Sequence, residues 1–530
     1  KREDFSLYED DKPVAITNFY AVPEAAQASP AGSASSEGSA TPVAAENAAA
    51  AAAPPVEQRL YLALFLDERS LTAPARNRLL PALERFVASR LHPGDRVLLA
   101  AYNGSTRILQ TPTENPEAIH TALRQLAKEN PRGTENEMDR RRVLSDLNQA
   151  ATQDEPNRPA MALEQANETY QAIRLLAQAG YDRVRATLGA VGQFVDALGG
   201  LPGRKAVVLV SGGLDERPGE ALFQIWLNKF ARFTQQVGAS NFEAFRNDTT
   251  KLFDNLVEHA NTSRVTFYTL AAPTDLSGRT ADVAGDPNWT QDLAATESRN
   301  LLLPLQALAA GTGGLAAADT PVSFLESLRG DLDSYYSLGY TPAFRKDGKK
   351  HRLSVRLADR NLRARTRESY RERTGLEVTA NHTFSALLLG EEVNPFGVSL
   401  AVEGESKDKK GQYQVTVLVK LPMEKLVLLP RGGAHEGRVR LFVGARDGEG
   451  RTSQVNEIAL PIRVANSELQ TVLGQSVGTR VTLLLRPGEH TLAVGVRDEL
   501  GNTDSTVTSQ YVAGSLTAAA AAASHPASSR

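Results

Sequence analysis

The hydrophobic pattern of this chain is organised around a short run at residues 59–67, Arg-Leu-Tyr-Leu-Ala-Leu-Phe-Leu-Asp. Near-continuous apolar residues over this length predict a central parallel strand that is buried on both faces. The run ends at Asp67, and polar residues follow it into a loop. Because ligands of open α/β sheets lie at the carboxyl ends of the strands, any binding chemistry is expected near Asp67.

Strand and helix patterns alternate after this run. Apolar stripes at helical spacing separate further strand patterns at 96–102, 205–211 and 264–270. This alternation predicts βαβ units and a mainly parallel, Rossmann-like sheet wrapped by helices, an α/β domain that we place at 58–374.

Two long helical insertions are expected inside this domain, at 131–203 and 219–262. In the first insertion two apolar stripes lie on either side of Gly180, which predicts two helices separated at that glycine.

The residues before the domain divide into two parts. Residues 1–23 contain two apolar stretches around an Asp-Asp-Lys-Pro turn, which predicts a β-hairpin. A hairpin alone is marginally stable in water, so we expect it to pack on the α/β domain. Residues 24–57 are mostly Ala, Pro, Ser, Gly and Glu, and this low-complexity composition predicts a flexible linker.

From residue 383 the pattern changes to short strands separated by turns. Nine candidate strands, the first at 384–389, predict an all-β sandwich of the immunoglobulin or fibronectin type over 383–513. The Ala- and Ser-rich tail at 514–530 is predicted to be disordered.

Composition narrows the possible functions. The chain has 530 residues, a formal net charge of −3 and no cysteine. The lack of a basic surplus argues against nucleic-acid binding, and the lack of cysteine excludes disulfides, thiol catalysis and cysteine-based metal sites. No apolar run is long enough to span a bilayer. Because the chain begins with lysine, a leader peptide is expected to have been removed.

Four motifs point to a known family. They are Asp4-Phe-Ser-Leu-Tyr-Glu-Asp, the strand ending at Asp67, Pro-Gly-Asp-Arg-Val at 93–97, and Tyr-Tyr-Ser-Leu-Gly-Tyr-Thr-Pro at 335–342 with Asp-Gly-Lys-Lys-His-Arg-Leu at 347–353. From Asp4 to Tyr370 the chain resembles the VWFA-related domain family described from Acidobacteria, a branch of the von Willebrand factor type A superfamily. The resemblance implies a Rossmann-like sheet wrapped by helices in a secreted or cell-envelope protein. The sandwich lies outside it.

The resemblance also implies a metal site with which this chain can be compared. Many type A domains bind a divalent cation such as Mg²⁺ or Mn²⁺ through Asp-x-Ser-x-Ser, a distant Thr and a distant Asp, because hard cations need several oxygen ligands. Asp67 matches the first position here. Arg69 and Leu71 stand where the two serines should be, and Ser70 is offset by one residue.

Two further residues could complete such a site. Thr134 matches the distant Thr, and Asp215 lies three residues after Gly212, beyond the second buried strand. One interpretation is therefore a remodelled Mg²⁺ or Mn²⁺ site that uses Asp67, Ser70, Thr134 and Asp215. The other, which we favour, is a degenerate site that holds no cofactor and in which Arg69 is an internal cation.

The sequence contains no catalytic constellation that we recognise. Ser211 follows a strand, but Leu209 stands where a nucleophile elbow needs glycine. We therefore expect a non-enzymatic, exported protein-interaction or adhesion-type protein whose type A domain contacts a protein partner. A structural subunit of a cell-envelope assembly that is joined by strand addition is the alternative, and an unrecognised hydrolase is a more distant one.

Overall fold

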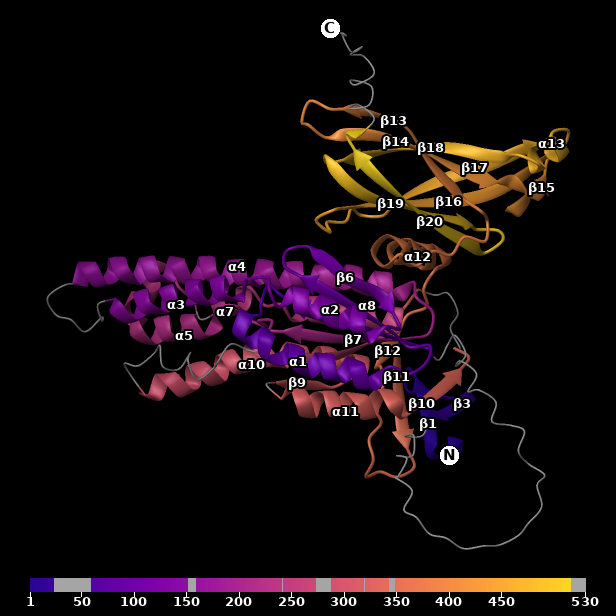
Figure 1. Cartoon of the computed structure of the whole chain (residues 1–530). Helices are drawn as coiled ribbons and strands as arrows, with labels where there is room; N and C mark the ends of the chain where they lie inside the picture. The colour runs from indigo at the N-terminus through magenta and orange to yellow at the C-terminus, as the bar shows by residue number, and fades with distance from the viewer. Residues whose placement is uncertain are drawn as a thin grey trace, which may run out of the picture.

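A computed structural model of the chain describes residues 1–22, 59–150, 159–240, 242–272, 287–318, 320–342 and 348–515. The predicted linker at 24–57 lies outside the described residues, as does the predicted tail apart from its first two residues. Figure 1 shows an α/β body, a small group of strands beside the N-terminus, and a β-sandwich that lies over one end of the body.

The body is built on a six-stranded, mostly parallel sheet with the strand order β6-β5-β4-β7-β8-β9. Only β6 runs antiparallel to its neighbour. Every residue of β4 is buried, which confirms the prediction of a central strand covered on both faces. The bounds are β4 Leu60–Asp67, β5 Arg96–Tyr102, β6 Thr106–Thr113, β7 Arg204–Ser211, β8 Val265–Ala271 and β9 Ala316–Ala318.

Helices flank both faces of this sheet, as the alternating pattern predicts. Successive side chains of β4 enter two different cores, so that Leu62 and Leu64 pack on one face and Ala63 and Phe65 on the other. The first core is closed by α1 Ala73–Arg90, α2 Pro116–Leu126 and α11 Pro321–Asp333. The second is closed mainly by α4 Pro159–Gly199, α8 Thr250–Ser263 and α10 Pro287–Thr312.

Helix α4 extends well beyond the sheet (Figure 1). It is a single helix of 41 residues, so the prediction that Gly180 separates two helices is wrong. Gly180 instead permits a close approach, because an added Cβ would lie 2.8 Å from the Cβ of Pro218. The N-terminal half of α4 packs in a separate core around Trp226, which donates from Nε1 to the carbonyl of Ala166 over 2.8 Å.

We call this outlying part the helical arm; it comprises α3, the first half of α4, α5 and the short helices that follow. The bounds are α3 Gly133–Gln149, α5 Glu220–Lys229, η3 Ala231–Phe233, α6 Thr234–Val237 and α7 Glu243–Arg246.

The N-terminal strands pair with strands that follow the body in sequence. Strand β1 lies between β2 and β11, from Phe5 opposite Leu357 to Glu9 opposite Leu353. Strand β3 leaves this sheet and pairs with β10 in a second one. The bounds are η1 Arg2–Asp4, β1 Phe5–Glu9, β2 Lys12–Val14, β3 Ile16–Val22, β10 Tyr335–Tyr340, β11 His351–Leu357 and β12 Ser369–Tyr370.

The C-terminal part contains two antiparallel sheets, one with the order β13-β14-β18 and one with the order β15-β16-β19-β20, in which β17 also pairs with β16. The bounds are β13 Ser399–Lys407, β14 Tyr413–Pro422, η4 Met423–Lys425, β15 Leu429–Arg431, β16 Ala434–Asp447, β17 Asn456–Ala465, α13 Leu469–Leu473, β18 Ser476–Leu485, β19 Gly488–Asp498 and β20 Thr503–Ala513.

The strand expected at 384–389 is a helix instead. These residues complete α12 Gly375–Leu389, which begins with a capping box of Thr374 and Glu377. Leu388 and Leu389 enter the core of the parallel sheet, and an added Cβ on Gly495 of the sandwich would lie 2.0 Å from Oγ1 of Thr383. Helix α12 therefore packs between the body and the sandwich, and burial on both sides explains an apolar run that resembles a strand.

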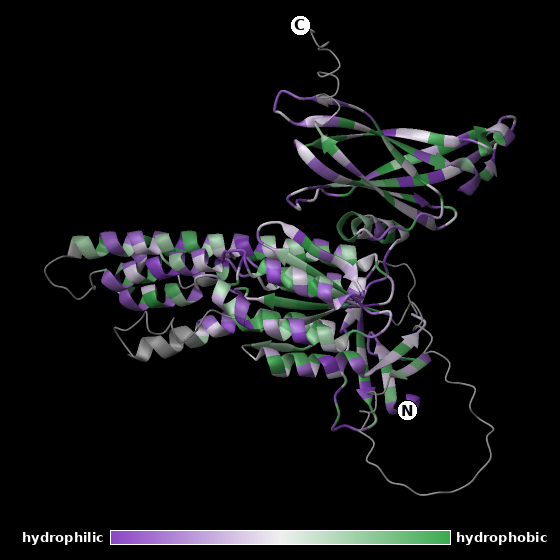
Figure 2. Cartoon of the chain, in the orientation of Figure 1, coloured by the Kyte–Doolittle hydropathy of each residue, from purple (hydrophilic) through white to green (hydrophobic). Residues whose placement is uncertain are grey.

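Figure 2 shows how hydropathy follows this arrangement: the strands of the parallel sheet are hydrophobic, whereas the outer helices and the sandwich strands mix both kinds of residue. Within the described residues, no helix combines the length and the apolar character that a membrane crossing requires.

Candidate functional site

The carboxyl ends of β4 and β7 bring three hydroxyl and carboxyl groups together. Asp67 is fully buried, and its Oδ2 accepts hydrogen bonds from Ser70 Oγ at 2.5 Å and from Ser211 Oγ at 3.0 Å. The two hydroxyl oxygens lie 2.9 Å apart. We call this group the Asp67 triad; it consists of Asp67, Ser70 and Ser211.

The electrostatics of Asp67 are set by burial. Burial raises the pKa of its carboxyl group above the ordinary value, and the hydroxyls of Ser70 and Ser211 oppose that shift by donating to the charged form. Its second oxygen, Oδ1, is buried and has no hydrogen-bond partner among the described residues. The triad thus contains one incompletely satisfied carboxylate beneath two serines.

Close backbone contacts hold the loop after Asp67 in place. The amide of Gly212 donates to Ser70 Oγ over 2.9 Å, and an added Cβ on Gly212 would lie 2.3 Å from the Ser70 carbonyl oxygen. On the other side, the amide of Gly133 donates to the Leu71 carbonyl over 3.0 Å. An added Cβ there would lie 2.3 Å from that oxygen. Both glycines are required because any side chain would collide with this loop.

The residue after Asp67 faces the opposite side of the loop. Glu68 forms a buried ion pair with Arg76 at 2.5 Å, and Arg76 also donates to the carbonyls of Ala127 and Glu129. Burial raises the pKa of Glu68 to about 7, although the charge of Arg76 opposes the shift. Glu68 therefore anchors the loop to α1 and to the end of α2, and it does not face the triad.

A cleft of about 130 Å³ opens above the triad, and both Asp67 and Ser70 line it. Four arginines also line it, Arg69 and Arg217 from two loops, Arg140 from α3 and Arg183 from α4. Arg140 is paired with Glu297 through two bonds of 2.7 Å.

Two of these arginines, Arg69 and Arg183, are less completely hydrogen-bonded or balanced by opposite charge. The Nε atom of Arg69 is buried without a hydrogen-bond partner among the described residues. Burial lowers the pKa of Arg183; the charge of Asp215 opposes this shift, and the charge of Arg69 adds to it. Arg69 and Arg183 thus place positive charge in the lining of the cleft.

The four predicted site residues are not all brought together. Asp67 and Ser70 bond directly, and Asp215 lines the same cleft. Thr134 does not line it: this exposed residue in the first turn of α3 borders a different hollow, with Met138 among its neighbours. Within the described residues there is no group of three or more His, Asp or Glu side chains that could hold a metal ion.

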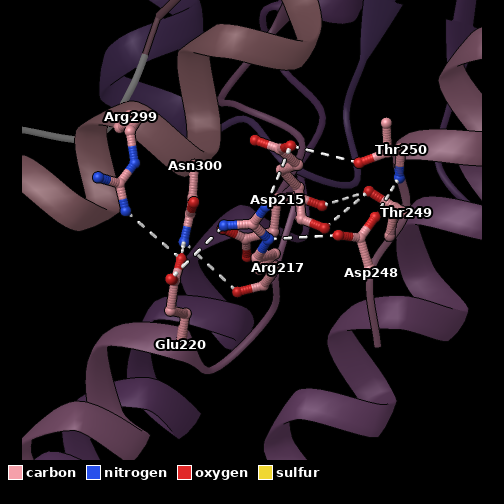
Figure 3. A network of polar contacts seen from close by, with 9 residues as sticks. Asp215, Arg217, Glu220, Asp248, Thr249, Thr250, Arg299 and Asn300 are labelled. Atoms are coloured by element: carbon pink, nitrogen blue, oxygen red, sulfur yellow. Dashed lines mark hydrogen bonds and ion pairs between the residues drawn. The ribbon is translucent and has the colours of Figure 1, made fainter. Parts of the chain in front are cut away.

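Asp215 belongs to a network that joins the helical arm to the body (Figure 3). Its carbonyl accepts from Thr249 Oγ1 at 2.9 Å, and Arg217 donates to Asp248 at 3.2 Å. Asn300 on α10 donates to Glu220 at 2.8 Å. The loop carrying Asp215 is therefore held by α8 and α10.

Ser211 was not included among the predicted site residues. Strand register is the feature that indicates Ser211. Strands β4 and β7 are parallel neighbours in which Leu66 pairs with Val210, and this register places Ser211 beside Asp67. The donor set of one carboxylate and two hydroxyls, with Arg69 beside it, does not fit the several-oxygen pattern of a type A cation site.

Comparisons with known proteins return only distant similarities. No family model matches the chain, and no curated protein matches it. Among solved structures, the chain is similar to the conserved hypothetical protein BatB from Bacteroides thetaiotaomicron, at 9% identity over 52% of this chain and 97% of that one, with a TM-score of 0.20.

Two other solved structures show similarity at the same level. One is an aerotolerance-related membrane protein from Bacteroides fragilis, at 10% identity over 52% of this chain and 98% of that one, with a TM-score of 0.22. The other contains three N-terminal domains of the type V pili tip protein Mfa5 from Porphyromonas gingivalis, at 10% identity over 86% and 71%, with a TM-score of 0.24. Similarity this weak carries no argument about function, and the resemblance to the type A family stays a prediction.

Proposed function

We propose that this chain is a non-enzymatic, exported protein-interaction protein, in which a type A-like domain contacts a protein partner at the carboxyl end of its parallel sheet without a bound divalent cation. The observation that supports the proposal is the hydrogen bonding within the Asp67 triad. Ser70 and Ser211 direct their hydroxyls to one carboxylate, at the place where a type A domain would coordinate its ion.

The surroundings of the triad support the same proposal. The cleft is lined by guanidinium groups rather than by further unpaired carboxylates, and Glu137, Glu220 and Glu297 are each engaged with an arginine. A divalent cation placed beside Arg69 would be repelled by its charge. An uncharged or acidic partner surface meets no such repulsion.

Site-specific cross-linking tests this function. A photo-reactive amino acid replaces Asp139, an exposed residue on α3 whose charge influences Arg183 at the cleft. Exposed Lys409, in the turn between β13 and β14, receives the same group as the control position. The labelled chains are incubated with the envelope fraction of the source organism and illuminated, with and without a chelator of divalent cations.

We expect a cross-linked protein from position 139, in equal yield with the chelator, and a reduced yield when Arg183 is also changed to Glu. A cross-link that requires Mg²⁺ or Mn²⁺ would contradict the metal-free proposal. Cross-linking from position 409 alone would assign the interaction to the sandwich instead.

A further inference from the structure

A cavity lies at the opposite end of the parallel sheet from the Asp67 triad. It has a volume of about 670 Å³ and is lined by the N-terminal strands, β10, β11 and the residues that begin or precede β7 and β8. A volume of this size is in the range of small-molecule sites. We call it the basal cavity.

One wall of the basal cavity is apolar and aromatic. Every second residue of β11 faces it, namely Leu353, Val355 and Leu357, because side chains of a strand alternate between two faces. Phe5 and Leu7 extend this wall, since they lie directly opposite Leu357 and Val355 in the sheet. Such a wall can receive the hydrocarbon part of a ligand.

The lining of the basal cavity also carries an excess of positive charge. Its cationic residues are Arg204, Arg264, Arg363, Arg365 and Arg367, with Lys1 at the edge. Its acidic residues are Asp4, Asp331 and Asp359. Counting side chains alone, six cations against three anions leave a surplus of three.

The carboxylates of this lining already have partners. Asp4 pairs with the backbone ammonium group of Lys1 rather than with its side chain, and Asp331 accepts from Arg365 and, over 2.7 Å, from Tyr268. Asp359 accepts from the amide of Asn361 over 2.9 Å.

Three arginines remain without such a partner. Among the described residues, none of the carboxylates lies within ion-pair distance of Arg264, Arg363 or Arg367. Arg204 differs, because its guanidinium stacks 3.5 Å above the ring of Tyr335. We call Arg264, Arg363 and Arg367 the arginine cluster.

Neighbouring cationic groups lie close enough to repel one another. Burial lowers the pKa of Arg367, and the charge of Arg264 lowers it further. Behind this lining, burial lowers the pKa of Lys205 to about 7, with Arg373, Arg264 and Arg367 adding to the shift. An anion bound between these groups would relieve their mutual repulsion.

We propose that the basal cavity binds a small organic anion, with its carboxylate or phosphate group held by the arginine cluster and its hydrocarbon part lying on β1 and β11. Guanidinium groups suit both acidic groups because their parallel N–H donors match pairs of oxygen atoms. The site is distinct from the Asp67 triad and does not depend on the function proposed for it.

Fluorescent probes of matched shape test the proposal on the full chain. The anionic probe is 1-anilinonaphthalene-8-sulfonate, and the neutral control is N-phenyl-1-naphthylamine, which has the same rings without the sulfonate. We expect one anionic probe per chain, bound at least about tenfold more tightly than the neutral one. Decanoate and decyl phosphate are then added separately, and the stronger competitor identifies the acidic group that the site prefers.

Substitutions of the cavity arginines distinguish probe binding in the basal cavity from probe binding elsewhere on the protein. Arg264→Gln and Arg367→Gln should each weaken the anionic probe about tenfold and leave the neutral probe unchanged. Arg78→Gln, at an exposed position on α1 away from the cavity, should alter neither. Because Arg367 is partly buried, the exposed variant Arg363→Gln provides a second test, and thermal melting checks the fold of every variant.

Two results would overturn the proposal. One is equal affinity for the anionic and neutral probes, which would leave no role for the charge. The other is anionic binding that persists unchanged in folded Arg264→Gln and Arg363→Gln chains.

Discussion

Two serine hydroxyls donate to the buried carboxylate at the end of β4. Ser211→Ala removes one of the two donors to Asp67, so the variant should lose about 1.5–3 kcal/mol of unfolding free energy, as expected for a hydrogen bond to a charged group. Ser89→Ala is the control, because the exposed Ser89 donates to the nearby Phe86 carbonyl on α1 and its loss should change stability by less than about 0.5 kcal/mol. Urea unfolding of both chains measures the difference, and equal stabilities would show that the triad contributes nothing.

The same triad yields a prediction about metal ions. Asp67, Ser70 and Ser211 supply fewer oxygen ligands than a hard cation needs, and Arg69 adds a repulsive charge. Titration calorimetry with Mn²⁺ should therefore give no saturable binding in the micromolar range. A saturable signal that disappears in Asp67→Ala would restore the metal-dependent interpretation of the sequence.

A buried lysine makes stability depend on pH. The pKa of Lys205 falls to about 7 on folding because the ammonium is buried among Arg373, Arg264 and Arg367, whereas the unfolded value is 10.5. Between these values the unfolded chain binds the additional proton, so the unfolding free energy should rise with pH from about 7 to 10.5. The raised pKa of Glu68 makes the unfolding free energy depend on pH only below about pH 7, so it does not change the slope between pH 7 and 10.5.

Lys205→Met should flatten this rise and increase the melting temperature at pH 7 by several degrees. Lys128→Met, at an exposed position after α2, should keep the slope of the original chain. Melting temperatures measured from pH 7.5 to 10 check the prediction. An unchanged slope in Lys205→Met would show that Lys205 stays charged in the folded state.

At the scale of elements, glycines decide where helices can approach the triad loop. Gly133→Ala places a Cβ 2.3 Å from the Leu71 carbonyl oxygen, and backbone must move to relieve the collision. We expect a loss of about 2 kcal/mol or more. Gly189→Ala on α4 meets nothing within 4 Å and should instead gain up to about 1 kcal/mol from helix propensity. Chemical denaturation compares the pair; equal effects would mean that the loop moves freely away from α3.

The sequence predicts the elements of the parallel sheet better than it predicts α12. Buried parallel strands such as β4 are nearly all apolar, so their pattern is easily recognised. The run ending at Leu389 is also nearly all apolar, but for a different reason, since α12 is covered by the body on one side and the sandwich on the other. Its capping box of Thr374 and Glu377 was the available signal for a helix.

The candidate site was predictable to a similar degree. Asp67 follows from its position after a buried strand, Ser70 follows from comparison with the type A metal motif, and the pairing with Ser211 follows from strand register. The place of Thr134 does not follow, because sequence spacing does not say which side of α3 faces the cleft. The arginine cluster is also hidden, since Arg264 and Arg367 lie about a hundred residues apart and meet only through the fold.

At the scale of the whole molecule, α12 changes the expected point of cleavage between body and sandwich. The predicted domains at 58–374 and 383–513 leave a short boundary between them, but its residues form the capped first half of a packed helix. Limited trypsin digestion should therefore leave this boundary intact while exposed loops are cut. Thr374→Ala removes the cap, costs about 1 kcal/mol, and should speed cleavage at Arg373. Rapid cleavage there in the original chain would contradict the packing of α12.

Helix α4 is a single long helix that connects the helical arm rigidly to the body. At about 1.5 Å per residue its 41 residues extend roughly 60 Å. Its first half packs into the core of the helical arm, and its second half packs into the core of the sheet. No loop interrupts it, so the arm cannot swing without breaking hydrogen bonds within the helix. A force that displaces the tip of the helical arm is therefore transmitted through α4 to the sheet and to α12. Helix α12 packs against α4 and contacts the sandwich.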